Sequence, residues 1–165
     1  VRSFMTTFLL PLTLLLANCA LAPSPILSAK SLGQISFGMP LVDAERTVGA
    51  RLNPSTVLVP ECDYVEFSEL PDARFMVENG LITRAEVQPS VANTLGIEVG
   101  ARLSEIQRAH PKAEVRPHKY DPDSHYIVFK SQDPKYAIVM EASDGLVTDI
   151  RAGLEPSVEY VEGCL

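Results

Sequence analysis

The residues best suited to chemistry lie together in the segment 117–125 (PHKYDPDSH) and its neighbour Tyr126. These candidate binding residues are His118, Tyr120, Asp121, Asp123, His125 and Tyr126. Imidazole and carboxylate groups are zinc ligands, but their spacing matches no standard site, and Asp-Pro-Asp-Ser is common in turns. Polar loops that carry an aromatic residue on a rigid sheet often serve recognition. We therefore predict a binding loop over residues 117–124, with no metal. A plain connection between strands is the alternative.

No catalytic motif accompanies this loop. The chain lacks Gly-x-Ser-x-Gly, His-Glu-x-x-His and a phosphate-binding loop, and the EF-hand glycine and closing glutamate do not follow Asp121 and Asp123. Carboxylate pairs such as Glu66 and Glu69 are unremarkable in a chain with 21 acidic residues. We predict that the protein is not an enzyme, has no catalytic residues and needs no cofactor.

The charge of the chain excludes two classes of partner. Residues 30–165 contain 13 basic and 21 acidic residues, a net charge of −8. Phosphate backbones and anionic lipids are bound by clusters of Lys and Arg, and no such run is present. We therefore expect no nucleic-acid partner, and membrane contact only through a lipid anchor. An acidic body suits a basic protein partner, although solubility explains it equally well.

A first hairpin is predicted over residues 74–87. Asn79-Gly80 separates two alternating segments, and this dipeptide tolerates the positive φ angles of a type I′ turn. Strict alternation places Leu81, Thr83, Ala85 and Val87 on one face of the sheet. It places Ile82, Arg84 and Glu86 on the other face, and this alternation is typical of an antiparallel sheet with one wet face. This wet face is a second candidate recognition surface.

A second hairpin follows the same pattern over residues 136–151, around Ala-Ser-Asp-Gly. An earlier strand precedes each hairpin, at residues 62–68 and 125–131. Short helices are expected over the apolar stripes of residues 40–48 and 103–109. Gly49 suits the position just after the first helix, and Pro111 ends the second.

These elements occur twice in the chain. Aligning Gly38 with Gly100 also aligns Leu41 with Leu103, and the segment 80–84 matches 145–149. The sequence predicts an α+β fold of two diverged repeats, each a short helix plus a three-stranded antiparallel sheet, with the helices packed on one face. The repeats span residues 30–93 and 94–165 and form one compact unit. Chance similarity is the alternative.

The doubled unit resembles the tandem-repeat fold of the secreted beta-lactamase inhibitor protein. Its opening, residues 38–44 (GMPLVDA), is similar to that of the SmpA/OmlA type of outer-membrane lipoprotein, with Pro40 in place of the usual Ser or Thr. The closing segment 158–164 (VEYVEGC) resembles a bacterial envelope family. The resemblance implies an inhibitor-like protein or an accessory of outer-membrane assembly.

The amino-terminal segment 1–29 has the parts of a signal peptide followed by a tether. Its apolar core is too short to span a bilayer comfortably, since spanning needs roughly 20 residues. Leu16-Ala17-Asn18-Cys19 resembles a lipobox, in which Cys19 is lipidated and becomes the amino terminus. Cleavage after Ala29 by a conventional signal peptidase and an uncleaved anchor are the alternatives. Cleavage at the lipobox predicts a periplasmic protein that is held at the outer membrane by lipid. Cleavage after Ala29 predicts a soluble protein that is periplasmic or secreted.

Only Cys62 and Cys164 remain in the body of the chain. Two cysteines in an exported protein most often pair, so we predict a disulfide between them. Together these observations predict an exported envelope protein that binds another, unidentified envelope protein. A structural accessory lipoprotein and a binder of cell-wall glycan are the alternatives.

Overall fold

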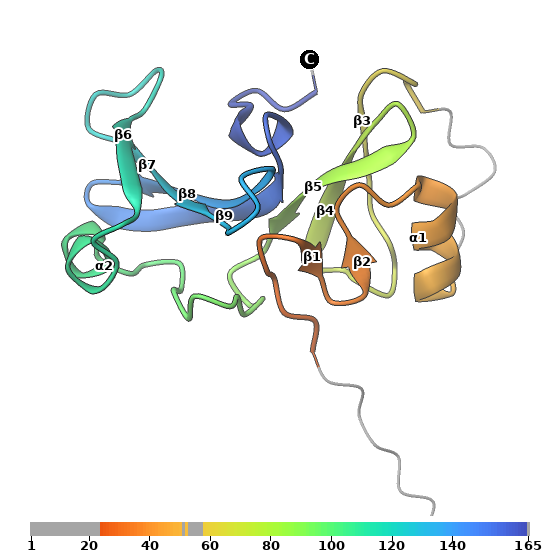
Figure 1. The fold of residues 1–165 in the computed structure, drawn as a ribbon, viewed down its shortest axis with the longest axis horizontal. Helices are drawn as coiled ribbons and strands as arrows, with labels where there is room; N and C mark the ends of the chain where they lie inside the picture. The colour runs from red at the N-terminus through yellow and green to blue at the C-terminus, as the bar shows by residue number, and fades with distance from the viewer. Residues whose placement is uncertain (1–23, 51, 53–57, 165) are drawn as a thin grey trace, which may run out of the picture.

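The fold is built on one seven-stranded antiparallel sheet, in the order β3-β4-β5-β9-β8-β7-β6 (Figure 1). The computed structural model describes residues 24–50, 52 and 58–164. The strands of this sheet are β3 (Asp63–Val65), β4 (Ala73–Glu78), β5 (Leu81–Val87), β6 (Glu114–Pro117), β7 (His125–Lys130), β8 (Tyr136–Ser143) and β9 (Leu146–Leu154). The remaining elements are β1 (Ser31–Leu32), β2 (Ile35–Ser36), α1 (Leu41–Val48), α2 (Leu103–Ala109) and the 3₁₀ turn η1 (Ser157–Glu159).

Both predicted hairpins form. Asn79 and Gly80 have φ angles of 49° and 78°, and Asp144 and Gly145 have φ angles of 51° and 77°. Asn, Asp and Gly are the residues that adopt this left-handed region with least strain, so the local sequence sets both turns. Strand β8 runs on to Ser143, so the second turn is only the Asp-Gly pair.

A β-bulge interrupts each hairpin at a threonine. The register shifts between Met76 and Val77 on β4, and between Glu141 and Ala142 on β8. The hydroxyl groups of Thr83 and Thr148 donate to the carbonyls of Met76 and Glu141, at 3.4 and 3.3 Å. The extra residue reverses the alternation. The predicted facing of β5 was therefore wrong at its start, because Ile82 is fully buried in the same core as Ala85.

The two helices are short and depend on the sheet. Gly49 has a φ of 74° and closes α1, as its sequence position predicts, and α2 ends just before His110 and Pro111. Ala44 of α1 and Ile106 of α2 are buried in the main core cluster. That cluster covers the sheet face of Phe75 and Met140, which we call the core face.

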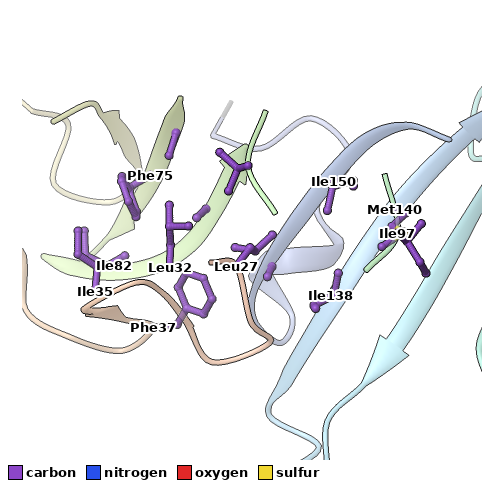
Figure 2. Packing of buried hydrophobic residues seen from close by; sticks show 14 of the residues in the cluster. Leu27, Leu32, Ile35, Phe37, Phe75, Ile82, Ile97, Ile138, Met140 and Ile150 are labelled. Carbon is purple, nitrogen blue, oxygen red and sulfur yellow. The ribbon is translucent and has the colours of Figure 1, made fainter. Parts of the chain in front are cut away.

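Residues 24–29, the described part of the amino-terminal segment, belong to the fold. Leu27 is fully buried, its N–H donates to the carbonyl of Ala92 at 2.9 Å, and it bridges to Asn93. Figure 2 shows Leu27, Leu32 and Phe37 packed among the side chains of the sheet. Leu27, which the sequence analysis assigns to the leader and tether, therefore takes part in the core. Cys19 lies outside the described residues.

The two halves of the chain share the sheet unequally. Strands β3 to β5 come from the first half and β6 to β9 from the second, and β5 pairs with β9 across the junction. The α+β class is confirmed, but three strands in each half are not found, because the second half contributes four strands to the sheet. Strand β6 is the element that the prediction lacked, a short edge strand that ends at Pro117 directly before the predicted binding loop.

Candidate functional site

The loop between β6 and β7, residues 118–124, is a compact turn held by its own hydrogen bonds. The N–H of His118 donates to the carbonyl of Ser124 at 2.9 Å, which closes the loop. The backbone N–H groups of Tyr120 and Asp121 both donate to Nδ1 of His118 at 3.2 Å. The imidazole side chain therefore organises the backbone that follows it.

Asp121 fixes the other half of this loop. One carboxylate oxygen accepts from the N–H of Asp123 at 3.1 Å, and the other accepts from the hydroxyl of Ser124 at 2.5 Å. The bond from Ser124 is the main reason why the pKa of Asp121 lies below its usual value, and the bond from Asp123 adds to it. The carboxylate form is thus the one that holds the turn.

Tyr120 is left exposed at the surface of this ordered loop, with 62% of its area accessible. The ammonium group of Lys119 lies 4.8 Å from the centre of its ring, and the ring of His118 lies 6.2 Å away. A large aromatic side chain on a preorganised loop loses little conformational entropy when it binds. Tyr120 is therefore the best-placed anchor among the candidate residues.

The remaining candidate residues are divided between the two faces of the sheet. The ring of Tyr126 stacks on His118 at 4.6 Å, and Nε2 of His118 lies 3.9 Å from a carboxylate oxygen of Glu141. His125 alternates with Tyr126 along β7 and so belongs to the core face, with Ile127. The loop therefore unites His118, Tyr120 and Asp121 with Tyr126, while His125 lies apart and Asp123 faces solvent.

Nowhere in residues 24–50, 52 and 58–164 do three or more His, Cys, Asp or Glu side chains gather as a metal site.

The face of the sheet opposite the core was expected to be wet, and this expectation was wrong at its centre. Residues 155–164 cross it and form what we call the carboxy-terminal strap (Figure 1). Val158 of the strap is fully buried against Val128, Ala137 and Val139. We call this side the strap face.

Two arginines on the strap face are buried beneath the strap. Arg84 and Arg151 are only 4% and 5% exposed. Arg84 donates to the carbonyls of Ser157 and Tyr160, at 3.3 and 2.6 Å, and Arg151 donates to that of Val158 at 2.7 Å. Sequence alternation correctly separates Arg84 from Ala85, but only the returning strap buries it.

Carboxylates neutralise these guanidinium groups. Glu86 pairs with Arg84 and with Arg74, and Glu141 pairs with Arg151. Burial raises the pKa of Glu86, but hydrogen bonds from Arg74, Tyr64 and Arg84 and the charge of Arg84 outweigh it, so the pKa lies below its usual value. Burial likewise raises the pKa of the Tyr64 phenol, whose hydroxyl donates to Glu86 at 2.9 Å.

A pocket of about 250 Å³ remains between the strap and the sheet. Its lining residues come from β3, β4, β5, β8, β9 and the strap: Tyr64, Arg74, Arg84, Glu86, Val87, Glu141, Asp149, Ile150, Arg151, Val161 and Glu162. Most of the charged groups are already paired with one another. The pocket is therefore polar but close to electrically balanced.

The strap ends at the predicted disulfide. Cys164 is joined to Cys62, with the two Cα atoms 5.3 Å apart. This bond connects the end of the chain to the segment before edge strand β3. The structure therefore contains the disulfide that the sequence analysis predicts from the two cysteines in the body of the chain.

Comparisons with protein-family models, with curated proteins and with solved structures give no match to this chain. The resemblance to the inhibitor fold and to assembly lipoproteins therefore stays a prediction. Within the described ranges, no helix has the length and apolar character needed to cross a membrane.

Proposed function

We propose that this chain is an exported, non-enzymatic module of the bacterial envelope that binds another protein through its β6–β7 loop. The observation that carries the proposal is the exposed Tyr120 on a turn ordered by His118 and Asp121. The disulfide is consistent with an oxidising compartment outside the cytoplasm. The location in the periplasm, with Cys19 as the lipid anchor, is part of this proposal.

The strap favours the loop over the sheet as the recognition surface. It covers the centre of the face that an open sheet would offer to a partner, and its contacts there are buried. The loop lies at the edge of the sheet, beside strand β6, where the strap contacts it through the exposed Lys119–Glu162 pair and leaves Tyr120 uncovered. Inhibition of a periplasmic or secreted enzyme is the sharper form of the proposal, because inhibitors commonly present a rigid loop with a single anchor.

We also infer that the fold is a doubled helix–hairpin unit whose copies have three and four strands. Matching contacts support this. The N–H groups of Gly38 and Gly100 donate to the carbonyls of Ile82 and Val147, each at 2.7 Å. Those of Leu41 and Leu103 donate to Gly80 and Gly145, each at 2.9 Å, and the two threonine bulges also correspond.

The test compares three forms of the chain as bait for detergent-solubilised envelope: the natural sequence, Tyr120→Ala, and Val42→Ala. Val42 is a matched control because it is also an exposed apolar side chain, 57% accessible, but lies on α1. Removal of a binding anchor typically costs about 2 kcal/mol or more, which is roughly a 30-fold loss of affinity. We expect Tyr120→Ala to lose the partner and Val42→Ala to retain it.

Tyr126→Ala separates recognition from stability. Tyr126 packs against His118 and the buried residues beneath the strap, so its removal should destabilise the fold by about 2 kcal/mol. Tyr120→Ala should change the melting temperature little, because its ring is exposed. A partner held equally by the Tyr120→Ala chain would refute the loop as the site. Recovery of barrel-assembly components with the natural chain would favour the role of an assembly accessory. Recovery of a soluble hydrolase would favour the role of an inhibitor.

A further inference from the structure

The strap is held to the sheet in two different ways along its length. Its first part, residues 155–160, buries Val158 and accepts charge-assisted hydrogen bonds from Arg84 and Arg151. Ser157 also donates to the carboxylate of Glu78. Burial of a valine and hydrogen bonds to charged groups each stabilise a docked segment. This part has its own non-covalent attachment.

The last part, residues 161–164, has few non-covalent contacts of this kind with the sheet. Glu162 pairs with Lys119 at 2.9 Å, but the lysine side chain is 54% exposed, and such exposed pairs contribute little to stability. Gly163 has a φ of 68° and lies so close to the Tyr64 hydroxyl that a Cβ atom would overlap it. The covalent bond from Cys164 to Cys62 is the strongest attachment of these four residues.

These same four residues include one wall of the polar pocket. Val161 and Glu162 line it from the strap, and Tyr64, Arg74 and Asp149 line it from the sheet. Lifting residues 161–164 would therefore open the pocket and uncover the Tyr64 hydroxyl. It would also free Lys119, which lies next to Tyr120.

We propose that residues 161–164 are a lid over this pocket, latched by the Cys62–Cys164 disulfide, and that a dithiol reductant opens it while residues 155–160 stay docked. In the reaction one thiolate of the reductant attacks a cystine sulfur and forms a mixed disulfide. Its second thiol then displaces the protein sulfur. The products are two protein thiols and the oxidised, cyclised reductant, so two electrons and two protons pass to the protein.

The test is ¹⁵N NMR relaxation on the full chain, before and after reduction with dithiothreitol. Rigid backbone gives order parameters of about 0.85, and flexible backbone values below about 0.6. We expect residues 161–164 to become flexible on reduction, while residues 157–160 and the sheet keep their values. A Glu-specific protease should then cut after Glu162 at least tenfold faster. Cys164→Ser should behave like the reduced chain and no longer respond to dithiothreitol.

Two results would overturn the proposal. If residues 161–164 stay rigid after reduction, the disulfide only stabilises the fold and does not hold a lid closed. Loss of order in residues 157–160 or in the sheet would mean that the strap has no independent attachment. Both readouts are made without a partner, so they stand or fall separately from the proposed binding function.

A second variant tests the lid with its latch intact. Gly163→Ala places a methyl group against the Tyr64 hydroxyl and should loosen residues 161–164 in the oxidised chain. Gly96→Ala is the matched control, since Gly96 also has a positive φ, 66°, but nothing lies within 4 Å of its added Cβ. If Gly163→Ala leaves residues 161–164 as rigid as Gly96→Ala does, the lid is refuted without any reduction of the disulfide.

Discussion

Arg84 and Arg151 keep their charges inside the protein because carboxylates and backbone carbonyls surround both guanidinium groups. Arg84 pairs with Glu86, and Arg151 pairs with Glu141. Removing a partner from a buried ion pair costs more than the pair contributes, because the remaining charge stays desolvated. Glu86 and Glu141 are therefore needed where they lie.

We expect Glu86→Gln to destabilise the protein by about 2 kcal/mol at neutral pH, because Arg84 would lose its carboxylate. The folded pKa of Glu86 lies below its ordinary value of 4.5. Its contribution is therefore fully present above that pH and is lost as the pH falls through the folded pKa. Urea unfolding between pH 7 and pH 3 should show a shallower loss of stability in Glu86→Gln than in the natural chain.

Glu114→Gln is the control for this change. Glu114 also pairs with an arginine, Arg116, but its side chain is 52% exposed. Exposed pairs contribute about 0–1 kcal/mol, so its unfolding curves should nearly match those of the natural chain. Equal losses in both variants would show that the burial of Arg84 has no special role.

At the scale of elements, Gly153 is the residue that lets the two halves of the sheet join. It pairs with Arg84 across β5 and β9, and a Cβ atom there would overlap the carbonyl of Thr83 and the Cα of Arg84. We expect Gly153→Ala to cost about 2–3 kcal/mol, since backbone atoms have no room to move aside. Gly145→Ala should cost only about 1 kcal/mol, from its positive φ in open space. Thermal unfolding measures both, and equal costs would contradict this explanation.

The amino-terminal segment supports a second expectation at this scale. A chain that starts at residue 30 lacks Leu27, which is fully buried, whereas a chain that starts at residue 24 keeps it. Loss of a buried leucine costs about 2–5 kcal/mol, so the shorter chain should melt at a markedly lower temperature. Leu27→Ala in the longer chain should reproduce most of this loss. Similar melting temperatures would mean that cleavage after Ala29 leaves the fold intact.

Elements with local signals were the ones that sequence could predict. Asn79-Gly80 and Asp144-Gly145 determine their own turns, and Gly49 and Pro111 mark helix ends. The bulge at Thr83 was missed because strict alternation was assumed. Strand β6 and the strap were missed because neither carries a local signal of its own. Strand β6 is defined by its pairing with β7, and the strap by contacts that include Arg84, more than 70 residues earlier.

The candidate site divides in the same way. The turn residues of the β6–β7 loop were found from composition, because Pro, Asp and Ser favour turns regardless of context. The separation of His125 from His118 could be predicted only with the register of β7 against β6. The burial of the strap face could be predicted only with the path of the whole chain.

At the scale of the whole molecule, one sheet runs through both halves and one main cluster of buried residues covers its core face. We therefore expect one cooperative unfolding transition. Far-ultraviolet circular dichroism, which follows the sheet, and near-ultraviolet tyrosine signals should give coincident urea curves. Two separated transitions would mean that the halves fold independently despite the β5–β9 pairing.

In a lipid-anchored chain, the docking of Leu27 would limit how far the body can stand from the membrane. With a lipid on Cys19, seven residues, 20–26, would separate the anchor from Leu27. An extended chain spans about 3.3–3.6 Å per residue, so Leu27 could lie about 25 Å from the anchor at most. In Figure 1 the described chain begins below the sheet, whereas the β6–β7 loop and the carboxy terminus lie above it. An anchored body would thus stay close to the lipid headgroups and could turn Tyr120 outward, toward partners in the space beyond.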